Sequence, residues 1–133
     1  MTPLFKKLNF KDQKEICIIN PPAEFDQEIE VMRSETGIND NLRDCKKADF
    51  VLLFVKTKKE IETFAAALQK KLEGDPVIWF AYPKKTSKKY QVEINRDSGW
   101  ESVRTLGLDT VRAVSIDDDW SALRFRKKEF IKK

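Results

Sequence analysis

The chain has 133 residues, of which 41% are hydrophobic and 36% charged, a composition that excludes a disordered chain and favours one globular domain over residues 1–133. No apolar run approaches the roughly 20 residues that a membrane-spanning helix needs, and the N-terminal residues MTPLFKKLNF lack the apolar core of a signal peptide. We therefore expect a cytoplasmic protein without a membrane partner. The net charge of +4 permits a polyanionic partner but does not require one.

The sequence contains no histidine. This absence removes the commonest general base, the commonest metal ligand and every Ser-His or Cys-His nucleophile. Two cysteines are too few for a metal cluster or a disulfide framework. Cys17 lies in an apolar segment and is expected in the core, whereas Cys45 lies in a polar segment and could be exposed. We accordingly predict neither a metal site nor a cofactor.

The N-terminal third reads as a helix, a strand and a second helix. Thr2 and Pro3 are typical of the cap and first turn of a short helix. Residues 15–20 (EICIIN) form the first buried strand, which the two prolines that follow terminate. A helix from about Pro22 to Arg33 then places on one face Phe25, Ile29 and Met32. Residues 35–47 read as a loop holding one short edge strand.

The central segment predicts a strand, a helix and a strand. Residues 50–55 (FVLLFV) and 77–82 (VIWFAY) are continuous apolar runs, which are typical of parallel strands covered by helices on both faces. Between them, Thr57 and Glu60 fit a capping box at the start of an amphipathic helix. Gly74 falls where a left-handed helix end is expected. This unit predicts a parallel sheet.

The C-terminal third predicts a short helix and a hairpin. Tyr90 to Asn95 reads as a weak extended segment, and residues 98–101 (SGWE) repeat the capping-box pattern before a helix that Gly107 closes. Residues 110–116 and 120–127 are strands that three aspartates join, which forces an antiparallel hairpin. The whole order predicts an α/β fold, a Rossmann-like three-layer sandwich around a mostly parallel sheet with a C-terminal antiparallel hairpin.

The carboxyl ends of the first three strands offer the main candidate ligand site. If these strands are neighbours, their ends meet at one edge of the sheet, where open α/β folds bind ligands. Lysines beside the free N–H groups of a helix N-terminus can form an anion pocket. The alternative is that polar, lysine-rich strand ends are merely solvated. The residues brought to this edge are Asn20, Lys56, Thr57, Tyr82, Lys84 and Lys85.

Two further groups of residues have alternative explanations. The carboxylates of residues 117–119 could hold Mg²⁺ or Ca²⁺, but aspartate is also a common turn residue. Cations lie near aromatic residues at 84–90 and 120–128, which is what single-stranded nucleic acid binding uses. Those aromatic side chains have ordinary core explanations, and Arg124 could instead pair with a hairpin aspartate.

Several segments together resemble a family of small bacterial proteins that have no assigned function. The matching segments are ICIINPPAEF, ADFVLLFVKTKKEIE, VIWFAYPKKTSKK, INRDSGW and the ending LGL…VSIDDDWSALRFRK. The order of elements is also similar to the second half of class I methyltransferases that use S-adenosylmethionine. This resemblance implies a Rossmann-like fold but transfers no activity by itself.

The sequence departs from the methyltransferase pattern where the cofactor binds. In those enzymes a glycine-rich turn follows the first strand, but residues 20–23 here are Asn-Pro-Pro-Ala. An acidic residue ending a clear second strand is not identifiable. Asn20-Pro21-Pro22 is similar to the Asn-Pro-Pro-aromatic tetrad of amino-group methyltransferases, yet Ala23 replaces the aromatic residue and the motif follows the wrong strand. The resemblance therefore implies that the cofactor site is absent.

Three functions remain open at this point. We expect a non-enzymatic domain that binds a small anionic ligand or a protein partner at the strand-end edge. The first alternative is a divergent group-transferase of the methyltransferase type. The second is a nucleic-acid-binding accessory protein, whose affinity would fall steeply with salt.

Overall fold

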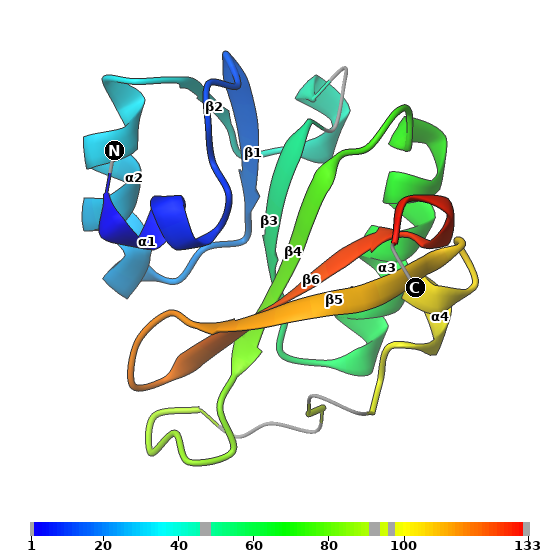
Figure 1. The fold of residues 1–133 in the computed structure, drawn as a ribbon. Helices are drawn as coiled ribbons and strands as arrows, with labels where there is room; N and C mark the ends of the chain where they lie inside the picture. The colour runs from blue at the N-terminus through cyan, green and yellow to red at the C-terminus, as the bar shows by residue number, and fades with distance from the viewer. Residues whose placement is uncertain (1, 46–48, 91–93, 96–97, 132–133) are drawn as a thin grey trace.

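The computed structural model describes residues 2–45, 49–90, 94–95 and 98–131. They form a six-stranded sheet in the order β2-β1-β3-β4-β6-β5 (Figure 1). The first four strands of this order are parallel, and β6 is antiparallel to both of its neighbours. The predicted mostly parallel sheet with a C-terminal antiparallel hairpin is therefore confirmed. The strands are β1 (Glu15–Ile19), β2 (Gly37–Asn39), β3 (Phe50–Phe54), β4 (Val77–Pro83), β5 (Leu108–Ser115) and β6 (Trp120–Lys127).

Helices cover both faces of the sheet. The helices α1 (Pro3–Lys7) and α2 (Asp26–Arg33) lie on one face, and α3 (Lys58–Leu68) and α4 (Glu101–Arg104) lie on the other (Figure 1). Each face buries its own apolar cluster. Single 3₁₀ turns complete the fold, namely η1 (Ala23–Phe25), η2 (Leu42–Asp44), η3 (Gln69–Lys71) and η4 (Lys128–Phe130).

The predicted unit of β3, α3 and β4 is the centre of the molecule. Every residue of β3 is at most 1% exposed, because helices cover both of its faces. Both halves of the capping box are present: the Thr57 side chain accepts a hydrogen bond from the Glu60 N–H, and the Glu60 side chain accepts one from the Thr57 N–H. A cap of this kind stabilises a helix by about 1 kcal/mol. The local sequence signals therefore gave the correct start of α3.

The N-terminal helix is fixed to the sheet through a tryptophan. Thr2 caps α1 by accepting a hydrogen bond from the Phe5 N–H at 3.1 Å, as predicted. Trp79 of β4 is fully buried, and its Nε1 donates to the Leu8 carbonyl at 2.8 Å. This bond satisfies an indole N–H that would otherwise be buried without a partner. It also links the C-terminal end of α1 to β4 in the interior of the sheet.

Other boundaries differ from the prediction. The helix after Pro22 begins with the η1 turn and becomes α-helical only at Asp26. The second capping box is wrong: α4 begins after Trp100, and within the described residues no side chain caps it. The predicted edge strand is β2. The extended segment expected at 90–95 and the C-terminal tail fall partly outside the described residues.

Within the described part of the chain, none of the helices has both the length and the apolar character that crossing a bilayer requires.

Candidate functional site

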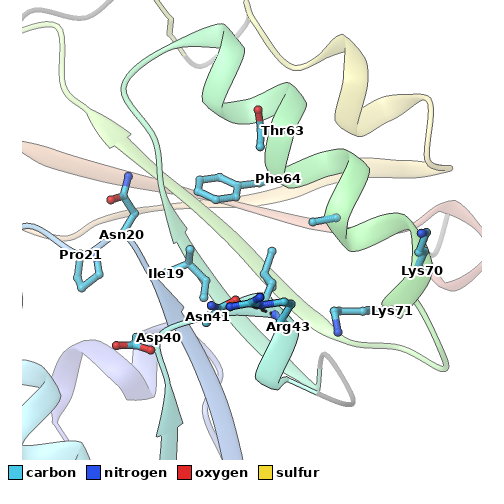
Figure 2. Close-up of a pocket in the computed structure, with 12 residues that line it drawn as sticks. Ile19, Asn20, Pro21, Asp40, Asn41, Arg43, Thr63, Phe64, Lys70 and Lys71 are labelled. Atoms are coloured by element: carbon cyan, nitrogen blue, oxygen red, sulfur yellow. Dashed lines mark hydrogen bonds between the residues drawn. The ribbon is translucent and has the colours of Figure 1, made fainter.

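A groove of about 1040 Å³ opens where the carboxyl ends of β1 and β2 meet helix α3 (Figure 2). The chain runs from β1 to β2 on one side and then crosses to β3 on the other, so the strand order reverses between β1 and β3. Open α/β sheets bind ligands in the crevice at such a reversal. The lining residues are Ile19, Asn20, Pro21, Asp40, Asn41, Leu42, Arg43, Thr63, Phe64, Ala67, Lys70 and Lys71.

The turn after β1 forms one end of the groove. Asn20 has a φ of 61°, in the left-handed region where glycine and asparagine are favoured. Its side-chain amide donates to the Glu60 carboxylate at 3.0 Å and to the Phe54 carbonyl at 3.4 Å, which joins the turn to the start of α3. Pro21 and Pro22 follow, and neither has a backbone N–H to offer a ligand.

Asp40 stands directly after the edge strand β2, at the same end of the groove (Figure 2). It is exposed, and it also borders a smaller hollow of about 590 Å³ between α2 and β2. This is the acidic residue after the second strand that sequence reasoning did not identify. The sequence pattern does not reveal this strand, because β2 has only three residues and lies in a polar stretch.

The opposite wall and the far end come from α3 and η3. Phe64 points from α3 toward Ile19 and Asn20, and Lys70 and Lys71 lie at the other end of the groove from Asp40 (Figure 2). The Lys71 Nζ donates to the Cys45 carbonyl at 2.7 Å. The groove therefore has Asp40 at one end and two lysines at the other, with both apolar and polar side chains, Arg43 among them, in between.

Cys17 and Cys45 form a disulfide beside this groove. Cys17 lies in β1 and Cys45 directly follows η2, and both side chains are buried, at 2% and 1% exposure. The expectation that Cys45 could be exposed is therefore wrong, and the two cysteines, which are too few for a framework, form one disulfide. The reason is that η2 folds back over β1, so Cys45 lies in the apolar core although the sequence around it is polar.

The structure separates the six residues predicted to form the site. Asn20 lines the groove; the other five, all within the described part of the chain, lie outside its lining. Thr57 caps α3, and Tyr82 is buried against Trp100 with 5.7 Å between ring centroids. The remaining three are lysines.

Two of those lysines contact neighbouring side chains. The Lys84 Nζ donates to the Ser115 hydroxyl at 2.6 Å. The Lys56 Nζ lies 4.8 Å from the centroid of the Tyr90 ring, within the range of a cation–π contact. Lys85 is exposed. The strand ends therefore meet as predicted, but their cations do not converge on the groove.

A polar cluster occupies the part of this edge near β4 and β6. The Glu24 carboxylate accepts hydrogen bonds from the Tyr90 hydroxyl at 2.9 Å, from the Lys89 Nζ at 3.2 Å and from the Trp120 Nε1 at 3.3 Å. Burial raises the pKa of Glu24, but the hydrogen bonds from Tyr90, from its own backbone and from Lys89 outweigh it and lower the pKa. Burial and the adjacent Glu24 raise the pKa of Tyr90.

The other candidate groups have structural roles. The Asp117 carboxylate accepts hydrogen bonds from the N–H groups of Asp119 and Trp120 at 2.8 Å each, as a turn residue does. In the described residues, no group of three or more potential ligands could hold a metal, and no hairpin aspartate bonds to Arg124. Trp120 and Phe125 are buried, so they offer no stacking surface to a nucleic acid.

Comparison with solved structures identifies the fold as that of class I methyltransferases that use S-adenosylmethionine. The chain aligns with such an enzyme from Aquifex aeolicus at a TM-score of 0.60, with 11% identity over 92% of this chain and 87% of that one. An enzyme from Clostridium acetobutylicum gives 0.54, with 8% identity over 92% and 87%. No family model matches the sequence, and no curated protein matches it.

A third similar structure contains a ligand. The N-methyltransferase NodS from Bradyrhizobium japonicum, in complex with S-adenosylhomocysteine, aligns at a TM-score of 0.53 with 14% identity over 86% of this chain and 67% of that one. These likenesses confirm the Rossmann-like fold and the distant similarity to class I methyltransferases. At such low identity they concern the fold alone.

The expected non-enzymatic domain that binds an anion or a protein partner at the strand ends is corrected here. The three solved structures described above are methyltransferases, so the methyltransferase-like alternative fits them better than the non-enzymatic interpretation does. The physical reason for the error is visible in the side chains. Lys56 and Lys84 contact Tyr90 and Ser115, and the hollow at this edge lies on the side of β1 and β2.

Proposed function

We propose that the protein is a group-transferase of the methyltransferase type, which binds an adenosine-bearing methyl donor in the groove. The observation that carries this proposal is the position of Asp40, directly after β2 and at the end of a groove at the strand-order reversal. Asp40 follows the Asn20 turn by twenty residues. In Rossmann folds an acidic residue at about this distance accepts hydrogen bonds from a ribose hydroxyl.

The groove suits the nucleoside part of such a donor. Asp40 would hold the ribose, while Phe64 and Leu42 supply apolar surface for a planar base and keep water from it. When bound, the donor would supply an activated methyl group for transfer to a nucleophilic atom. The contribution of the chain is to bind and orient the nucleoside.

The turn after β1 fits the amino-acid part of S-adenosylmethionine less well. In the enzymes that the sequence resembles, glycines let the backbone approach the cofactor at this turn. Here Asn20 keeps the left-handed conformation, but Pro21 and Pro22 have no N–H to donate. We therefore expect the affinity to come mainly from the nucleoside.

Calorimetry with S-adenosylhomocysteine and with adenosine tests this proposal. The wild-type protein should bind both, and Asp40→Ala should weaken both by about tenfold, because a charge-assisted hydrogen bond is lost. Asp44→Ala is the matched control, since Asp44 is an exposed carboxylate on η2 outside the groove lining. The absence of heat at millimolar ligand, or equal losses for the two variants, would contradict the proposal.

Three further proposals come from the sequence alone. We propose a cytoplasmic location, a single domain over residues 1–133, and membership of the family of small bacterial proteins that the segments resemble. Their support is composition and local sequence pattern. The acceptor of the transferred group would be the partner molecule of the reaction.

A further inference from the structure

One wall of the groove comes from the short segment that follows β2. This segment, residues 40–45, supplies Asp40, Asn41, Leu42 and Arg43 to the lining. It contains a single 3₁₀ turn, which the Asn41 side chain caps by accepting a hydrogen bond from the Arg43 N–H at 2.9 Å. A single turn has little stability of its own, so the position of the wall depends on what anchors it.

The anchoring of the segment by the sheet is slight. β2 pairs with β1 over only three partner positions, and it is the edge strand. The Asn39 side chain adds a hydrogen bond to the Glu15 carboxylate. Short edge strands are among the least stable parts of a sheet. The wall would thus be loosely held if the sheet alone determined its position.

The Cys17–Cys45 disulfide supplies the strongest anchor. Cys17 lies in β1 two residues before Ile19, which lines the groove, and the Cα atoms of the two cysteines are 6.4 Å apart. The bond therefore joins the strand beneath the groove to the end of its wall. The Lys71 Nζ, which donates to the Cys45 carbonyl, adds a link from the opposite wall. Both walls meet at Cys45.

We propose that the redox state of the Cys17–Cys45 pair controls the order of the groove wall and, through it, the affinity of the groove for its ligand. The effect on affinity rests on the proposed function, whereas the effect on the wall does not. The bond holds the segment against β1 when oxidised. When it is reduced, the segment retains the Leu42 contact, the Lys71 hydrogen bond and the short β2 pairing.

The reaction that switches the pair is thiol–disulfide exchange with a dithiol. One thiolate of the dithiol attacks a sulfur of the Cys17–Cys45 bond and forms a mixed disulfide, which the second thiol then resolves. Two electrons and two protons pass to the protein, which gains two thiols, and the dithiol becomes a disulfide. Because both cysteines are buried, the reductant reaches them only when the segment opens.

Amide hydrogen exchange measured without ligand tests the effect on the wall. We expect exchange in residues 37–45 to be at least tenfold faster in the protein reduced with dithiothreitol than in the oxidised protein, with β3 and β4 unchanged. The variant with Cys17→Ala and Cys45→Ala should match the reduced protein and should not respond to dithiothreitol. Equal exchange in the two states, or an increase spread over the whole sheet, overturns the proposal.

Calorimetry with S-adenosylhomocysteine on the same oxidised and reduced samples tests the effect on the ligand. We expect at least fivefold weaker binding after reduction, and no effect of dithiothreitol on the double alanine variant. Equal affinity in both states overturns the control of affinity. If neither state binds, the proposed function fails, and the hydrogen-exchange result still decides whether the disulfide orders the wall. The reduced wild-type protein serves if the variant does not fold.

Discussion

The two halves of the carboxyl edge of the sheet differ in whether their polar side chains line a groove or bond to one another. On the side of β1 and β2, side chains surround a groove; on the side of β4 and β6, they bond to one another. On the second side the Ser87 hydroxyl donates to the Asp119 carboxylate at 2.8 Å, and the Glu24 carboxylate accepts hydrogen bonds from three residues. Polar side chains at strand ends are therefore a poor guide to a site unless their partners inside the protein are known.

The comparison also assigns different structural roles to the two sides. On the side of β1 and β2, the groove side, the segment after β2 is held by a disulfide, a three-residue strand and one lysine hydrogen bond, so a single chemical change can alter it. The side of β4 and β6, where polar side chains bond to one another, is the closed side, and it is held by several hydrogen bonds that converge on Glu24. Removing one of them should leave the others in place.

The largest expected effect is loss of the disulfide. Its cysteines are separated by 28 positions, and a loop of that size stabilises the folded state by about 3.5 kcal/mol in the chain-entropy model. Urea unfolding of the oxidised protein, compared with the double variant Cys17→Ala and Cys45→Ala, should show a loss of about this size. Dithiothreitol should lower the stability of the wild type alone. A loss below about 1 kcal/mol would mean that the groove side has other anchors of similar strength.

A smaller effect is expected for Glu24→Gln, about 0.5–1 kcal/mol, because the charge-assisted bonds from Tyr90 and Lys89 weaken at an exposed position. The pKa of Glu24 is lowered in the folded state from its ordinary value of 4.5, so its contribution is present above that pH and is lost as the pH falls through the folded pKa. The variant should therefore lose less stability than the wild type between about pH 5 and pH 3.

Glu62→Gln is the control for this measurement, since Glu62 is an exposed carboxylate on α3. It should reproduce the acid sensitivity of the wild type. If Glu24→Gln shows the same acid sensitivity as the wild type, Glu24 does not hold the closed side together.

The smallest effect is expected for Lys84→Ala. The Lys84 Nζ bonds to Ser115 at the surface, so its removal should change the free energy of unfolding by less than about 0.5 kcal/mol. Binding of S-adenosylhomocysteine should not change, because Lys84 lies outside the groove lining. Weaker binding by this variant would show that the closed side takes part in ligand recognition after all.

The parts of the fold that the sequence predicted are those with local causes. The Thr57–Glu60 capping box and the apolar runs of β3 and β4 depend on residues within a few positions of one another, so composition and spacing were sufficient. The hairpin of β5 and β6 followed from its short connection for the same reason. These elements also located the edge of the sheet at which the groove lies.

The parts that the sequence did not predict depend on long-range contacts. Asp40 gains its position only because the three-residue β2 pairs with β1, and Cys45 becomes buried only because η2 folds back over that strand. The contacts that Lys56 and Lys84 make in the structure likewise involve residues far along the chain, Tyr90 and Ser115. No local pattern in the sequence marks these contacts.

The three tryptophans give the protein its own optical reporters. Each is at most 1% exposed, and each indole N–H donates to a different segment: Trp79 to Leu8 after α1, Trp100 to Asn95, and Trp120 to Glu24. An indole in a dry, hydrogen-bonded setting emits at shorter wavelength than one in water. The intrinsic fluorescence of the unlabelled chain therefore follows the docking of the N-terminal helix, the entry to α4 and the closed side of the edge.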